Sequence, residues 1–164
     1  MAKSGKIETC HRFDERLLAC YRELLQTTNL QKAYQEWFRW FRFLRNELER
    51  RMPDYQFQGT VAENGMEYAY FQFASVELKE KGLKIVVAFL HRDFSLEVWL
   101  SGVNRKSQAL WEEKLRSAAT SFSCTADPLH TDYILRAPIP VNWADGNAVV
   151  ATLEQTVERL LSEI

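Results

Sequence analysis

Two short strings contain the residue types of a metal-dependent nuclease. Pro53-Asp54, followed by Glu77-Leu78-Lys79, matches the PD…ExK spacing, in which two carboxylates hold Mg²⁺ and the lysine polarises the attacking water. Such a site needs its ExK segment on a core strand. Residues 77–82 read ELKEKG, which is typical of a charged connection, and Asp54 fits a turn after a helix. A metal-dependent nuclease that uses Asp54, Glu77 and Lys79 is therefore the alternative function. In the competing interpretation, the ELKEKG segment is a solvated loop without a catalytic role.

A second candidate is a ligand pocket on one face of the predicted sheet. This face is expected to be apolar with few polar groups, the usual composition of a ligand pocket. The residues expected to bind the ligand are Phe71, Phe73, Lys84, Glu97 and Trp99, with Arg105 just beyond the strand. In the alternative interpretation, helices cover this face completely, as is usual when a strand pair is apolar on both sides.

Glu97 is the acidic residue within this otherwise apolar strand. An unpaired carboxylate would be costly to bury there, so Glu97 needs a basic partner, open water or a ligand that donates to it. Lys84 on the neighbouring strand and Arg105 near the next helix are the expected internal partners.

The chain shows no recognisable catalytic or cofactor motif. Neither GxSxG nor GxGxxG occurs, and Cys10, His11 and Cys20 lack a fourth ligand for structural zinc. We therefore predict no catalytic residue, no metal and no cofactor. The predicted function is a non-catalytic module that binds a small molecule or a protein.

Composition restricts the cellular setting. The net charge of −1 gives no support for a nucleic-acid binder held by phosphates. Three irregularly spaced cysteines favour a reducing compartment, and neither an apolar leader segment nor a membrane-length apolar window is present. We expect a cytoplasmic, soluble protein without membrane contact. The oligomeric state is not predicted.

Alternation of apolar residues predicts two antiparallel hairpins. Residues 83–90 and 94–101 both alternate, and a turn at Arg92-Asp93 would place Phe89 opposite Leu96. Asn64-Gly65 supplies the two positive φ angles of a type I′ turn between Tyr55–Glu63 and Met66–Phe73. This register places Val61 opposite Tyr68 and Gly59 opposite Tyr70. A fifth strand is predicted over Thr131–Ala137.

Helical periodicity predicts four helices around these strands. The first spans Phe13 to Thr27, and the second spans Leu30 to Arg51 with Trp37 and Phe41 buried at the middle of its apolar stripe. Asn104 is expected to cap a third helix that ends near Ala119, and Asp145 a last one. The predicted order is ααββββαβα, an α+β fold with a mainly antiparallel sheet. We expect one domain over residues 1–164, with residues 1–11 as a loose tail.

Three segments carry a family resemblance. They are LRNELERRMPDYQFQG (Leu44 to Gly59), MEYAYFQF (Met66 to Phe73) and LKIVVAFLHRDFSLEVWLSGVNRKSQ (Leu83 to Gln108), followed by Trp111. Between about Leu24 and Arg116 the chain resembles an uncharacterised bacterial family of domains of unknown function. The resemblance implies a self-contained domain and brings no activity with it.

Overall fold

The computed structural model describes residues 11–164, which form two compact units, one ending at Phe38 and the other running from Arg39 to Ile164. The predicted loose tail over residues 1–11 lies outside the described residues except for its last position.

Helical segments make up the first unit. Helix α1 spans Glu15–Thr27 and begins where the Asp14 carboxylate accepts from the backbone N–H groups of Arg16 and Leu17. Helix α2 spans Leu30–Arg51, the predicted range, and its first residues belong to this unit. Both predicted helices are confirmed, although α1 starts two residues later than expected.

The second unit contains a six-stranded antiparallel sheet with strand order β1-β2-β3-β4-β6-β5. Its strands are β1 (Gln56–Asn64), β2 (Tyr68–Ala74), β3 (Leu83–Leu90), β4 (Ser95–Gly102), β5 (Ser123–Cys124) and β6 (Leu135–Ile139). Its helices, after the end of α2, are α3 (Val76–Glu80), α4 (Arg105–Arg116) and α5 (Gly146–Leu161). The α+β fold with an antiparallel sheet is confirmed, in the order ααββαββαββα. Helix α3 and strand β5 were not predicted.

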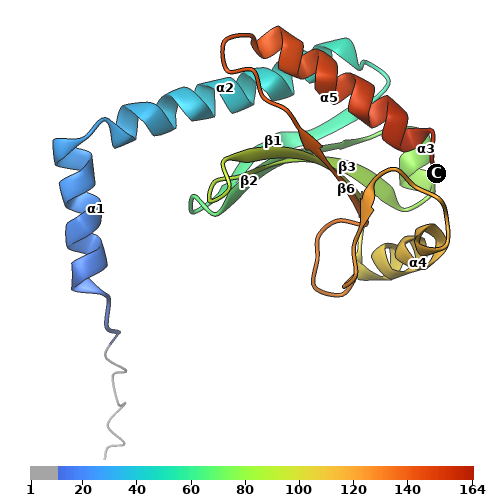
Figure 1. Ribbon diagram of the computed structural model, residues 1–164, viewed down its shortest axis with the longest axis horizontal. Helices are drawn as coiled ribbons and strands as arrows, with labels where there is room; N and C mark the ends of the chain where they lie inside the picture. The colour runs from blue at the N-terminus through green and yellow to red at the C-terminus, as the bar shows by residue number, and fades with distance from the viewer. Residues whose placement is uncertain (1–10) are drawn as a thin grey trace, which may run out of the picture. The chain divides into compact units, whose positions relative to one another are not determined.

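The main core lies between one face of the sheet and two helices. Helix α5 and the end of α2 run over this face in Figure 1. From α2, the fully buried Phe41 ring lies 5.3 Å from Phe71 of β2 and 6.3 Å from Phe89 of β3, measured between ring centroids. Trp37, in the first unit, is also buried. The predicted burial of Trp37 and Phe41 is confirmed.

The β3–β4 hairpin has the predicted register. Phe89 pairs with Leu96, and Val86 pairs with Trp99. The backbone N–H of Phe94 donates to the carbonyl of His91 at 3.2 Å, which closes the turn over Arg92-Asp93. Both strands are buried along most of their length, and the short turn between them sets the register of the pair.

The β1–β2 hairpin exists, but its predicted register was wrong. The positive φ angles fall on Gly65 and Met66, so the turn is displaced by one residue and Asn64 pairs with Tyr68. The register then shifts between Gln58 and Ala62, where Gly59 adopts a φ of +60°. This irregularity is a β-bulge, which a pattern of strict alternation cannot show.

The predicted fifth strand was wrong in its bounds. Strand β6 begins at Leu135 and continues through Pro138, which pairs with Glu97 of β4. Strand β5 pairs with β6 at Leu135 and Arg136, so Pro138 lies beyond the end of β5. A proline is tolerated there because β5 has already ended, so no strand on that side of β6 needs a donor from residue 138.

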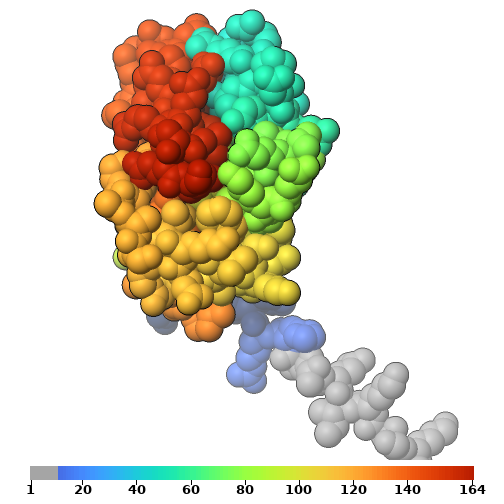
Figure 2. Space-filling model, turned by 90° about the vertical axis from the view of Figure 1, so that its right-hand side faces the viewer, coloured from blue at the N-terminus to red at the C-terminus, as the bar shows by residue number. Residues whose placement is uncertain are grey.

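The remaining helix boundaries follow their caps. Asn104 and Asp145 cap α4 and α5 as predicted, although α4 ends at Arg116 rather than near Ala119. The C-terminal end of α5 is tied to the segment after α4, because Glu163 accepts from the hydroxyls of Thr120 and Ser121. Figure 2 shows this side of the molecule, with the chain of α5 directly beside that of α4 and the residues after it.

We expect Phe41→Ala to lower the free energy of unfolding by about 3–5 kcal/mol, because it opens a cavity between α2 and the sheet. Phe43→Ala is the matched control, because Phe43 lies on another side of α2 and is 39% exposed. This variant should lower the free energy of unfolding much less. Urea unfolding measures both variants. Equal losses in the two would show that the stripe through Phe41 does not face the core.

Candidate functional site

The second face of the sheet carries a pocket of about 300 Å³. Its apolar part is formed by Val86 of β3 and Trp99 of β4, which belong to a small buried cluster together with Ala88. Aromatic rings from β2 and polar groups from α4 and the following loops complete the walls. The lining residues are Tyr68, Tyr70, Gln72, Lys84, Val86, Trp99, Gly102, Val103, Asn104, Arg105, Gln108 and Asp132.

Three predicted ligand-binding residues meet in this pocket. Lys84 of β3 and Trp99 of β4 lie on the second face by strand alternation, and Arg105 enters from the first turn of α4. The sequence pattern brought these three together correctly. Whether they bind a ligand remains a prediction.

The placement of Phe71 and Phe73 on this face was wrong. In the β2–β3 register, Phe71 pairs with Val87 and Phe73 with Ile85, and paired residues share a face. Both phenylalanines therefore belong to the main core, where they are almost fully buried. The error arose because the connection between β2 and β3 has no turn signal that sets their register.

Glu97 is held by protein groups and does not line the pocket. The indole Nε1 of Trp99 donates to its Oε2 at 2.7 Å, and Arg136 Nη1 lies 4.0 Å from its Oε1. The expected partners, Lys84 and Arg105, were wrong. Arg136 takes this role because it lies on β6, directly opposite Trp99, whereas Lys84 is bonded elsewhere.

The junction between β4 and α4 forms one wall of the pocket. A Cβ added to Gly102 would lie 2.4 Å from the backbone nitrogen of Gln108, so the first turn of α4 can approach β4 only at a glycine. The Asn104 side chain accepts from the backbone N–H of Ser107 at 2.8 Å and caps the helix. The GVNRKSQ string thus sets the position of the Arg105 and Gln108 side chains.

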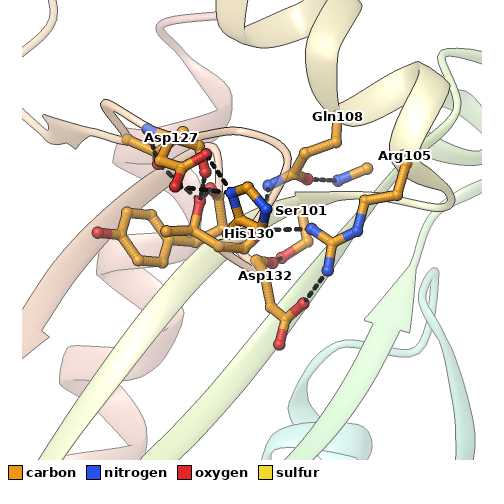
Figure 3. A network of polar contacts seen from close by, with 10 residues as sticks. Ser101, Arg105, Gln108, Asp127, His130 and Asp132 are labelled. Carbon is orange, nitrogen blue, oxygen red and sulfur yellow. Dashed lines mark hydrogen bonds and ion pairs between the residues drawn. The ribbon is translucent and has the colours of Figure 1, made fainter.

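Gln108 connects this junction to the loop before β6. Its Oε1 accepts from the Gly102 backbone N–H at 2.8 Å, and its Nε2 donates to the Thr131 carbonyl at 3.2 Å (Figure 3). The side chain is buried, with 3% of its surface exposed. Both ends of the amide are therefore satisfied by backbone groups from separate segments.

Arg105 and Asp132 extend the same network across the mouth of the pocket. Arg105 donates from Nη1 to the Thr131 carbonyl at 2.5 Å and from Nη2 to the Asp132 carboxylate at 2.9 Å (Figure 3). The Ser101 hydroxyl donates to the Asp132 carbonyl at 2.6 Å. Within the loop, the Asp127 carboxylate lies 2.9 Å from His130 Nδ1. The loop is thus fastened from both β4 and α4.

Lys84 is half-buried on the floor of the pocket. Its Nζ donates to Gln72 Oε1 at 2.9 Å, and Gln72 in turn donates to Gln58 on β1 at 3.0 Å. Burial lowers the pKa of the Lys84 ammonium because the charged form loses hydration, and the negative charge of Asp132 opposes this shift. The ammonium therefore carries a desolvation cost.

Several pocket residues were missed by the sequence prediction. Tyr68 and Tyr70 follow from alternation on β2 once the hairpin register is known, and Gln108 follows from one helical turn after Asn104. No local pattern marks Asp132, because a loop of irregular structure brings it to α4.

The residues of the nuclease alternative do not have the arrangement that this activity needs. Glu77 lies in the first turn of α3 rather than on a strand, and its carboxylate accepts from Lys81 at 2.8 Å. Lys79 donates to the Gln56 side chain, and Asp54 lies in the turn after α2. Within residues 11–164, no group of three or more His, Cys, Asp or Glu side chains could hold a metal ion.

Among the helices of the described part of the chain, none is long and apolar enough to cross a membrane.

The fold and its pocket define a class: an α+β domain whose antiparallel sheet is covered by helices on one face and holds a pocket on the other. The chain belongs to the family described as Domain of unknown function (DUF7000), whose model matches residues 14–164. This match extends the predicted resemblance, which ended near Arg116, through α5. No curated protein matches the chain. No solved structure matches it.

We expect Gln108→Leu to destabilise the protein by about 1–3 kcal/mol, because the substitution leaves the Gly102 N–H without its acceptor and removes one of the two side-chain donors to the Thr131 carbonyl. Gln155→Leu, at an exposed position on α5, is the matched control and should have little effect. Urea denaturation measures both. A Gln108→Leu protein as stable as its control would contradict the bridging role.

Glu97→Gln should change stability by less than about 1 kcal/mol, because the amide oxygen still accepts from Trp99 and the Arg136 side chain is 45% exposed. Glu97→Leu removes the acceptor as well and should cost about 1–3 kcal/mol. Thermal unfolding of the two variants separates the hydrogen bond from the charge. Equal losses in the two variants would show that the charge, which both substitutions remove, dominates over the hydrogen bond to Trp99.

Proposed function

We propose that the protein is a binding module whose second-face pocket takes a small molecule with a planar ring. The observation that carries this proposal is the pocket itself: a hollow of about 300 Å³ with an apolar base and polar groups converging at its mouth. This size matches the lower end of small-molecule sites, which hold roughly 300–1,000 Å³.

The planar ring is inferred from the aromatic walls. Tyr68 and Tyr70 stack along β2 with ring centroids 5.9 Å apart and an interplanar angle of 21°. Trp99 lines the base, and its indole is fixed by the hydrogen bond to Glu97. Rings held in this way offer flat apolar surface at little cost in conformational entropy.

Binding is favoured over catalysis because the polar side chains at the mouth already have structural partners. Gln108 holds backbone groups of two segments, and Arg105 is paired with Asp132. These groups shape and stabilise the pocket, which is what a preorganised binding site requires.

Titration of ¹⁵N-labelled protein with indole tests the proposal. The Trp99 indole N–H resonance, assigned from a Trp99→Phe variant, is expected to shift in a saturable manner. Tyr70→Leu removes a ring from the wall and should weaken indole binding, whereas Tyr21→Leu on the exposed surface of α1 should not. A Trp99 resonance that stays unchanged up to the solubility limit of indole would refute the proposal.

A further inference from the structure

The charge of the pocket identifies the class of ligand more closely, and this inference rests on the proposed function. We propose that the ligand carries one carboxylate on its planar ring and that the Lys84 ammonium binds this group. The pocket lining contains two cations, Lys84 and Arg105, and one anion, Asp132, so its formal charge is +1.

The excess positive charge is located at Lys84. Arg105 and Asp132 neutralise each other across 2.9 Å, and Arg105 also donates to the Thr131 carbonyl. Lys84, by contrast, donates to the neutral amide oxygen of Gln72. Its cross-strand neighbour on β4 is Ser101, which is neutral as well.

A half-buried ammonium that donates to a neutral amide is costly, because burial removes water and the one anion of the pocket lining, Asp132, is already paired with Arg105. Methionine would cover the same strand surface without this cost. The ammonium also lies in the same hollow as Trp99 and Tyr70, so a ring placed against them brings its substituent to Lys84. An anionic substituent there would offset the desolvation of Lys84.

One net charge favours a carboxylate over a phosphate. A carboxylate leaves the complex neutral, whereas a dianionic phosphate would leave an excess negative charge beside Asp132. Asp132 thus acts against ligands with more than one negative charge.

Isothermal titration calorimetry with naphthalene-2-carboxylate and naphthalene-2-carboxamide tests this inference, because the two probes share a ring and differ in charge. The carboxylate should bind at least about tenfold more tightly, as expected for one charge-assisted hydrogen bond. Naphthyl 2-phosphate serves as the dianionic probe and should bind more weakly than the carboxylate.

Lys84→Met should abolish the preference for the carboxylate, so that the carboxylate and the carboxamide bind with similar affinity. Lys114→Met is the matched control, since Lys114 lies over the Trp111 ring and outside the pocket lining. In the unaltered protein, carboxylate affinity should fall as the pH rises through the lowered pKa of Lys84, because the ammonium loses its charge; carboxamide affinity should not change with it.

The outcomes separate the two proposals. If both probes bind equally, or if Lys84→Met retains the preference, the carboxylate inference is wrong and the ring-binding pocket stands. Tighter binding of the phosphate overturns the inferred single charge. If neither naphthalene probe binds and the chemical shift of the Trp99 indole N–H does not change with indole, both proposals are wrong.

Discussion

The buried amide of Gln108 is the interaction on which the geometry of the pocket depends. It joins the end of β4 to the loop before β6, and both of its bonds go to backbone groups beyond the β4–β6 ladder, which ends at the pair of Leu100 and Leu135. Because backbone polar groups that lose water must be paired, this one side chain allows two irregular segments to pack closely. The positions of Arg105 and Asp132 then follow from the segments that carry them.

The two faces of the sheet differ, because one carries the main core and the other carries the pocket. On the helix-covered face, the rings of Phe41, Phe71 and Phe89 pack with little exposure, which suits a core. On the other face, Trp99 packs against Val86, Ala88 and the partly buried Tyr133, and polar groups line the hollow beside it. Because alternation assigns each strand residue to one face, β3 contributes Ile85 to the core and Lys84 to the pocket.

The fold could be predicted wherever one local rule determined the outcome. The β3–β4 pairing followed from alternation, and α4 followed from the Asn104 cap. The β1–β2 register could not, because Gly65 and Met66 both adopt positive φ and a bulge follows at Gly59. In the pocket, Lys84, Trp99 and Arg105 were found from strand and helix position. Phe71 was assigned to the wrong face, and Asp132 was not predicted to line the pocket. In both cases the residue is positioned by a connection whose course depends on tertiary contacts.

The two outer edges of the sheet have a consequence for self-association. The outer strand β1 is interrupted at Gly59, whose carbonyl already accepts from Arg45 Nη2 at 2.6 Å. At the opposite edge β5 has two residues, and β6 continues past it through Pro138. An incoming strand would meet a kinked, charged edge on one side and a missing donor on the other. Within the described residues, both outer edges of the sheet therefore disfavour the edge-to-edge pairing of strands that leads to fibrous aggregates.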